Sequence, residues 1–368
     1  MKILRVAADI YPDVVGGVGL HVHEMSKEQV QLGNHVDIYT AGSNDKPAHE
    51  KRGGYEIKRF KPLIKLLGNS IMPNMLFSLY KNRYDYDVIH AHSHLYFSTN
   101  LCAIIRKLGS SPLVITNHGL NSQTAPPWFQ DIYTATGAKF TFNAADKIIC
   151  YTESEKAELL KLKVPSEKIE VIHNGIDTEH FIPAQEPAFD KKSLLWIGRY
   201  AKGKGVDYLI DAFNILKSEH PDATLTMIGK GPDKSKIVQK IQDLNLEKDI
   251  RMEEFIPNSE IVQLYQQSSV FVLPSLEEGV PRTILEAMAC CVPVVCTRLP
   301  QLVDIVEGSG LLVPVKDPRT LADSISRLLA NNSLAKELGD SGRENVVANY
   351  SWKDTVKKTL LIYANLVE

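Results

Sequence analysis

The sequence is poor in cysteine, has no long apolar run and carries no excess of one charge. Its five cysteines show no Cys-x-x-Cys pair, so neither a disulfide framework nor a zinc site is indicated, and reduced thiols in a cytoplasm are expected. No apolar stretch approaches the roughly 20 residues of a membrane-spanning helix, and the N-terminus lacks the pattern of a signal peptide. A net charge of −2 gives no general reason to bind nucleic acid. We therefore expect a cytoplasmic protein without a nucleic-acid partner.

The near-neutral total conceals one strongly basic segment, residues 46–83. This segment holds nine basic and only two acidic side chains, a balance of +7. Such a run is commonly a solvated face of the protein. Between residues 61 and 84, however, the cations are mixed with Leu, Ile, Met and aromatic residues, which suits an anionic membrane surface, and Pro73 interrupts any long helix. The second expectation is therefore peripheral association with the cytoplasmic membrane face, near a membrane-bound or lipid-linked acceptor.

The length of 368 residues is too great for one comfortable core, which predicts two domains. Short apolar runs alternate with amphipathic segments along nearly the whole chain, a pattern typical of parallel sheets covered by helices on both faces. The predicted strands are 3–8, 36–40, 87–91, 112–117, 147–152, 168–173, 193–198, 224–229, 249–254, 270–274 and 292–296. The predicted helices include 18–32, 153–162, 206–218 and 234–245. The Pro-containing segment 181–189 breaks the alternation, so we expect domains at 1–182 and 183–350 and a final helix at 351–368.

Unusual residues follow the carboxyl ends of these strands, where open parallel sheets bind ligands. Gly16 and Gly17 follow the first strand, and glycines there let backbone N–H groups approach a phosphate, although they also simply permit a tight turn. His118 follows strand 112–117, and a lone histidine is more often structural. Arg199 and Lys204 follow strand 193–198 among glycines, an arrangement that suits a diphosphate or a solvated basic turn.

Two carboxylates follow the strand at 270–274. Glu278 is predicted in the loop and Glu286 about one turn into the next helix, with Pro281 at the first helical position. This spacing does not place both carboxylates on one helical face, so they would touch different parts of one extended ligand. It therefore argues against a glycosidase pair that flanks a single bond. Cations for phosphates and carboxylates for hydroxyls together indicate a nucleoside diphosphate sugar.

The order of several motifs resembles the retaining glycosyltransferases of family 4. These motifs are GGVG (16–19), TNHG (116–119), IHNGIDTEHF (172–181), IGRYAKGKG (197–205) and PSLEEGVPRTILEAMA (274–289). The resemblance runs the whole length of the chain. It implies an α/β protein of the GT-B fold, with two facing Rossmann-like, doubly wound parallel-sheet domains, an interdomain cleft, and a C-terminal helix that crosses back to the first domain.

The resemblance also implies roles for individual residues. Gly16 and Gly17 would cover the donor phosphates, and Arg199 and Lys204 would neutralise the diphosphate, so that no divalent metal or other cofactor is needed. His118 and Glu278 would contact the transferred sugar, and Glu286 the ribose. The further donor contacts that it implies are Ile256 beside the base and Gly279, Val280, Pro281, Arg282, Thr283 and Ile284 at the helix start.

The implied activity is that of a hexosyltransferase that uses a UDP- or GDP-linked sugar and a hydroxyl acceptor in glycolipid, polysaccharide or glycan synthesis. Two alternatives stay open, a catalytically silent nucleotide-sugar-binding subunit and a non-hydrolysing UDP-sugar epimerase. The sequence departs from the family at Val14-Val15, which lack the lysine of starch and glycogen synthases. It departs again at Cys291, which replaces a glycine and is expected to reshape the sugar pocket.

Overall fold

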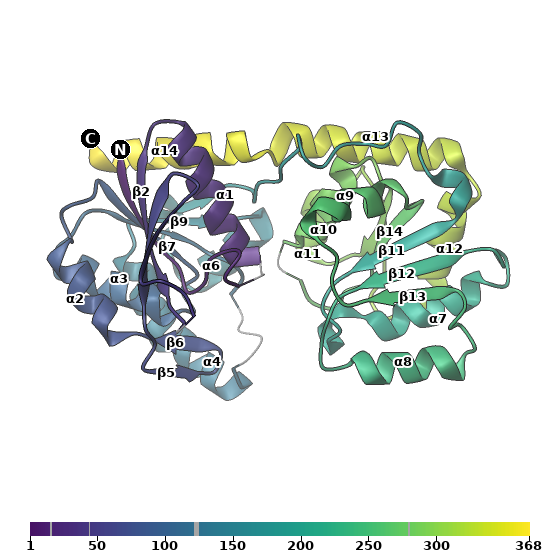
Figure 1. Ribbon diagram of the computed structural model, residues 1–368, viewed down its shortest axis with the longest axis horizontal. Helices are drawn as coiled ribbons and strands as arrows, with labels where there is room; N and C mark the ends of the chain where they lie inside the picture. The colour runs from purple at the N-terminus through teal and green to yellow at the C-terminus, as the bar shows by residue number, and fades with distance from the viewer. Residues whose placement is uncertain (15–16, 44, 121–124, 279) are drawn as a thin grey trace. The chain divides into compact units, whose positions relative to one another are not determined.

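The structure is a computed structural model that describes residues 1–14, 17–43, 45–120, 125–278 and 280–368. The chain divides into two compact units. The first consists of Met1–Gly175 together with Trp352–Glu368, and the second of Ile176–Ser351 (Figure 1). Each unit is built on its own sheet of mainly parallel strands, as the alternating sequence pattern predicts.

The first unit has an eight-stranded sheet in the order β10-β9-β8-β7-β1-β2-β4-β3. Every neighbouring pair is parallel except β3 and β4. The strands are β1 (Lys2–Val6), β2 (His35–Ala41), β3 (His49–Arg52), β4 (Tyr55–Phe60), β7 (Val88–His92), β8 (Leu113–Thr116), β9 (Lys147–Cys150) and β10 (Ile169–Val171). The strand order reverses at β1, and the carboxyl ends beside such a switch point are where doubly wound sheets bind ligands.

Helices cover both faces of this sheet (Figure 1). Apolar side chains of α2, α3, α5 and α6 pack on one face, and those of α1 and α14 pack on the other. The helices are α1 (Gly17–Gln31), α2 (Pro73–Lys81), α3 (Phe97–Lys107), α4 (Pro127–Tyr133), α5 (Lys139–Ala144), α6 (Glu153–Lys161) and α14 (Trp352–Val367), and a π-helical segment (Thr134–Ala138) joins α4 to α5. The C-terminal helix α14 is thus part of the first unit.

The basic segment 46–83 contains regular structure that the sequence analysis missed. It forms β3, β4, a separate hairpin of β5 (Ile64–Leu66) and β6 (Asn69–Ile71), and α2. Charged residues alternate with apolar ones in β4, whose burial pattern changes almost residue by residue. This half-buried alternation is the strand signal, but the high charge concealed it. Pro73 is the first residue of α2, where its missing N–H costs nothing.

The second unit has a six-stranded parallel sheet in the order β13-β12-β11-β14-β15-β16. Its strands are β11 (Ser193–Ile197), β12 (Thr224–Ile228), β13 (Ile250–Glu253), β14 (Val270–Leu273), β15 (Val294–Thr297) and β16 (Leu311–Val313). Side chains of α7, α8 and α12 pack on one face, and those of α9, α10, α11 and α13 on the other. These helices are α7 (Val206–Leu216), α8 (Lys234–Asp243), α9 (Asn258–Gln266), α10 (Arg282–Ala289), α11 (Pro300–Val306), α12 (Pro318–Leu329) and α13 (Asn332–Asn349).

The division between the units falls at Gly175–Ile176, a few residues before the linker expected from the sequence. Phe181 is buried in the core of the second unit. Arg343 of α13 donates to the carbonyl oxygens of Phe181 and Thr178 at 2.6 and 3.0 Å. These contacts bind residues 176–182 to the second unit, so the proline-rich stretch is not where the units separate.

Within the described residues, none of the helices combines the length and the apolarity that crossing a membrane requires. The five cysteines are all free. All eleven predicted strands and the predicted helices are present, with ends that differ by at most two residues.

Candidate active site

The first group of predicted site residues lies at the carboxyl edge of the first sheet. Gly17 is the exposed first residue of α1, whereas Gly16 lies outside the described residues. His118 follows β8 and is partly exposed. Its ring lies among side chains from three other elements, because β7, β8 and β9 are neighbours and end at the same edge.

His118 is hydrogen-bonded on both sides of its ring. Its Nε2 lies 3.1 Å from Nδ1 of His92, at the end of β7. Its Nδ1 lies 3.0 Å from the hydroxyl of Tyr151, which follows β9, and the same hydroxyl is farther from Nε2, at 3.4 Å. Burial lowers the pKa of His118 to about 3, so the ring is neutral over the physiological range.

Tyr151 is held in place by the start of α6. The Thr152 side chain accepts a hydrogen bond from the backbone N–H of Glu155, and the Glu155 carboxylate accepts one from the backbone N–H of Tyr151, at 2.7 Å. This reciprocal arrangement resembles a capping box and satisfies donors that the helix leaves unpaired. Burial raises the pKa of Glu155 to about 7. The cap therefore fixes the residue whose hydroxyl meets His118.

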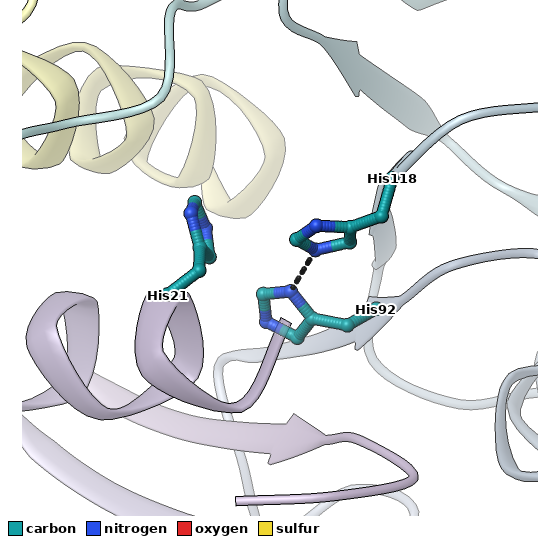
Figure 2. A group of neighbouring side chains, drawn as sticks. All are labelled: His21, His92 and His118. Carbon is teal, nitrogen blue, oxygen red and sulfur yellow. Dashed lines mark hydrogen bonds between the residues drawn. The ribbon is translucent and has the colours of Figure 1, made fainter. Parts of the chain in front are cut away.

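His21, His92 and His118 bring three imidazoles together (Figure 2). One nitrogen from each lies within 4.8 Å of the others, a spacing at which three imidazoles could together bind a divalent cation. The guanidinium of Arg5, however, lies 2.9 Å from Nε2 of His92. A permanent positive charge in contact with one ring opposes the binding of a second cation there. The cluster therefore does not fit a metal site.

The second group of predicted site residues lies at the carboxyl edge of the second sheet. Arg199 follows β11 and is exposed. Lys204 ends a 3₁₀ turn, Lys202–Lys204, and the carbonyl of Gly203 in this turn accepts the backbone N–H groups of Leu276 and Glu277 at 2.8 and 3.2 Å. The loop after β11 is thus bonded directly to the loop after β14.

Gly205 makes this close approach possible. It has a φ of +63°, and a Cβ at this position would lie 1.9 Å from the carbonyl oxygen of Pro274. Only glycine accommodates both conditions. Lys204 is therefore held against the loop that carries Glu278.

Lys204 and Glu278 form a short ion pair. The Lys204 Nζ lies 2.6 Å from Oε1 of Glu278, and the hydroxyl of Ser275 donates to the same oxygen at 2.7 Å. The Glu278 side chain is 6% exposed and that of Lys204 is 21% exposed. Both of these contacts are made to Oε1.

Glu286 lies in α10, as expected, while Glu278 lies in the loop before it. Oε2 of Glu286 accepts a hydrogen bond of 2.8 Å from the buried Tyr265 hydroxyl, and Nε of Arg282 lies 3.6 Å from Oε1 of Glu286. Burial and the Glu286 charge raise the pKa of Tyr265 well above its usual value. Glu286 thus has fixed protein partners of its own, separate from those of Glu278.

The residues at the start of α10 differ in what they can offer a ligand. Pro281 precedes the helix as its N-cap and is not its first residue, a difference of one position. Val280, Arg282 and Thr283 are partly exposed. Ile284 is fully buried and its N–H donates to the Pro281 carbonyl, so its side chain and N–H are both occupied. Of the two other predicted contacts, Ile256 is partly buried, and Gly279 lies outside the described residues.

Cys291 lies away from Glu278, the predicted contact of the transferred sugar. It follows α10 with a φ of +56°, at the opposite end of the eight-residue helix from Glu278. A helix of this length spans about 12 Å. The residue occupies the left-handed position after a helix at which glycine is preferred, which explains the glycine of the family pattern.

Family models match both units. Residues 15–180 match the model described as Glycosyltransferase Family 4, and residues 177–345 match Glycosyl transferases group 1. The chain belongs to glycosyltransferase family 4. It is therefore a sugar-transferring enzyme, as the motif order predicts.

Other proteins support this assignment over the full length of the glycosyltransferase. The alpha-maltose-1-phosphate synthase of Mycolicibacterium smegmatis is 26% identical, with 99% of each chain covered. The sucrose-phosphate synthase structure from Thermosynechococcus elongatus has a TM-score of 0.84 at 24% identity and covers 100% of this chain and 99% of that one. The structure of Anabaena HepE in complex with UDP-glucose has a TM-score of 0.79 at 18% identity, covering 99% and 100%. The fold is accordingly GT-B, with two Rossmann-like domains.

The sequence analysis missed the partners of His118. His92 lies just after the predicted strand 87–91, and neither His92 nor Arg5 was singled out. A signal was available, since Arg5 is the one charge inside the apolar run ILRVAA and His90 and His92 alternate along a buried strand. Period-two spacing places both histidines on the same face of the sheet.

Proposed function

We propose that this glycosyltransferase moves a hexose from a UDP- or GDP-linked sugar to a hydroxyl acceptor, with retention of configuration and without a divalent metal. The observation that carries the proposal is the pairing of Lys204 with Glu278 at the carboxyl edge of the second sheet, together with exposed Arg199, which follows β11 at the same edge. Two cations suit a diphosphate, and a carboxylate suits sugar hydroxyls. HepE, whose structure contains UDP-glucose, supports the choice of donor.

The proposed chemistry needs no protein nucleophile. The bond between the anomeric carbon and the diphosphate oxygen breaks while the acceptor oxygen bonds to the same face of that carbon. The acceptor proton passes to an oxygen of the departing diphosphate. Arg199, Lys204 and the N-terminal N–H groups of α10 stabilise the charge that develops on this group. His118 is the proposed contact of the transferred sugar and Glu286 that of the ribose.

Donor binding and turnover separate the proposal from its alternatives. UDP-glucose and GDP-mannose would be titrated calorimetrically in EDTA, and turnover followed by release of the nucleoside diphosphate. The proposal requires binding in EDTA, release that depends on an acceptor, and a product whose anomeric configuration by NMR matches that of the donor. Tight binding without turnover on any acceptor would indicate a silent subunit, and conversion of the donor without acceptor an epimerase. Metal-dependent binding or an inverted product would contradict the mechanism.

We further propose that the acceptor is met at an anionic membrane at the cytoplasmic face, through the hairpin β5–β6 and α2. Leu63, Ile64, Leu66 and Phe77 are 75, 53, 55 and 74% exposed. The neighbouring Lys61, Lys65 and Lys81 are also exposed. Apolar side chains interspersed with lysines match a surface that inserts between anionic headgroups.

Part of the positive charge of residues 46–83 is neutralised by ion pairs within the first unit. Buried Arg59 binds Asp13 and Glu50, each at 2.6 Å, and Arg52 binds the same two carboxylates. Asp13 lies outside residues 46–83, so the charge of the segment overstates what it presents to a membrane. The exposed lysines are what remains for an anionic surface.

Co-sedimentation with vesicles of phosphatidylglycerol and phosphatidylcholine tests the membrane proposal. We expect binding that weakens as salt is raised and that is lost in Leu63→Ser/Leu66→Ser. Leu361→Ser is the matched control, because Leu361 is 57% exposed on α14. Equal binding by both variants, or no binding by the wild type at low salt, would refute the proposal.

A further inference from the structure

Arg5 is a buried cation in an unusual place. It lies in the middle of β1 and is fully buried on the face that α1 and α14 cover. Within the part of the chain that the structure describes, its hydrogen-bond partners include no carboxylate. Its Nη2 donates to Gln29, and its Nη1 lies 3.1 Å from the sulfur of Met25. A buried charge without an opposite charge is costly, so the position calls for an explanation.

The Tyr363 hydroxyl is also hydrogen-bonded to Arg5, and two further partners are the histidines of β7. Arg5 and His90 are directly opposed in the β1–β7 register. Arg5 Nη1 lies 2.9 Å from Nε2 of His92 and 3.3 Å from Nδ1 of His90. The second nitrogen of His90 lies 2.7 Å from the Thr116 hydroxyl.

A guanidinium donates hydrogen bonds and accepts none. At 2.9 Å, Nε2 of His92 must therefore be the acceptor, since two N–H groups facing each other at this distance repel. The hydrogen of the neutral His92 ring then lies on Nδ1. This nitrogen lies 3.1 Å from Nε2 of His118, so His92 donates and His118 accepts (Figure 2).

The same reasoning fixes the tautomer of His118. With Nε2 accepting from His92, the hydrogen of the neutral His118 ring lies on Nδ1, which faces the Tyr151 hydroxyl at 3.0 Å. A doubly protonated His118 would oppose its Nε2–H to the Nδ1–H of His92. Burial and the charge of Arg5 both lower the pKa of His92, in agreement with a neutral pair.

We propose that Arg5 is a positioning residue that acts through His92 to hold His118 as the neutral tautomer with its hydrogen on Nδ1. The Tyr151 hydroxyl, or a ligand hydroxyl that displaces it, meets a donor at this nitrogen. The Nε2 lone pair is engaged by His92 and is not available to remove a proton from an acceptor. The significance of this tautomer for sugar transfer rests on the proposed function, but the tautomer itself does not.

Long-range ¹H–¹⁵N correlation spectra of the full chain, labelled with ¹⁵N-histidine, test the proposal directly. His118→Gln identifies the His118 signals. We expect the wild type to show a single neutral form of His118, protonated at Nδ1, at pH 7. Protonation at Nε2, or on both nitrogens, would overturn the proposal without any further variant.

Arg5 variants test the cause of that tautomer. In Arg5→Met, which keeps a long buried side chain but removes the donor, the single Nδ1–H form of His118 should be lost in favour of a mixture. Arg5→Lys, which restores a cationic donor, should recover part of it. Arg106→Met is the matched control, because Arg106 lies on α3 and binds Asp146. This variant should leave the spectrum unchanged. An unchanged Nδ1–H form in folded Arg5→Met would refute the role of Arg5.

Calorimetry with UDP-glucose on the same wild-type sample separates this inference from the proposed function. If the tautomer is as expected and UDP-glucose does not bind, the proposed donor is wrong while the role of Arg5 stands. If UDP-glucose binds and the tautomer is Nε2–H, the role of Arg5 is wrong while the proposed donor stands.

Discussion

Gly205 offers the sharpest test of how the second unit holds its loops together. A Cβ on this residue would lie 1.9 Å from the Pro274 carbonyl oxygen, whereas real Cβ contacts are essentially never shorter than 3.0 Å. Gly205→Ala must therefore push the two loops apart by about 1 Å, at a cost of about 1–3 kcal/mol. The φ of +63° adds about 1 kcal/mol for a residue with a side chain. We expect a loss of about 3 kcal/mol in the free energy of unfolding.

The matched control is Gly203→Ala in the same turn. Among the described residues, a Cβ there would meet only Glu277, at 3.8 Å, so the expected change is within about 0.5 kcal/mol. For a unit of this size, about 3 kcal/mol corresponds to a fall in Tm of about 6–12 °C, measurable by differential scanning calorimetry alongside urea unfolding. If Gly205→Ala unfolds within 0.5 kcal/mol of Gly203→Ala, the direct contact between the loops is wrong.

Three further predictions concern the end of α10, the cap of α6 and the cation beside Glu278. Cys291→Gly should raise the free energy of unfolding by about 0.5 kcal/mol, because relief of the φ of +56° exceeds the entropy cost of glycine; a loss of stability in urea unfolding would contradict this. Burial raises the pKa of Glu155 to about 7 from 4.5, so its contribution to stability is complete below pH 4.5 and is lost as the pH rises through 7, by about 3 kcal/mol. Glu155→Gln keeps an acceptor for Tyr151 and should remove this decline, which unfolding at pH 5 and pH 8 would reveal; a decline equal to that of the wild type would count against the buried carboxylate. Lys204→Met should weaken UDP-glucose binding about tenfold to a hundredfold by calorimetry, whereas exposed Lys202→Met should not, and equal effects of the two would argue against a specific role for Lys204.

The sequence alone was sufficient to predict eleven of the sixteen strands that the structure describes. It also predicted most helices and the edge of each sheet at which the expected site residues lie. These features are local, since an apolar run of five residues or a proline at a helix start is visible without knowing its neighbours. The positions of His118, Arg199 and Glu278 after strands 112–117, 193–198 and 270–274 followed from that local reading and from the rule that parallel sheets bind ligands at their carboxyl ends.

Which side chains meet became known only from the folded chain. Arg5 and His92 are brought together by the register of β1 with β7, and a shift of one residue would send them to opposite faces. Asp13 joins Arg59 across 46 residues of chain, which removes charge from the basic segment that the sequence emphasised. Pairing of this kind depends on strand order and register. These properties are set by the packing of the whole unit, so no single stretch of sequence predicts them.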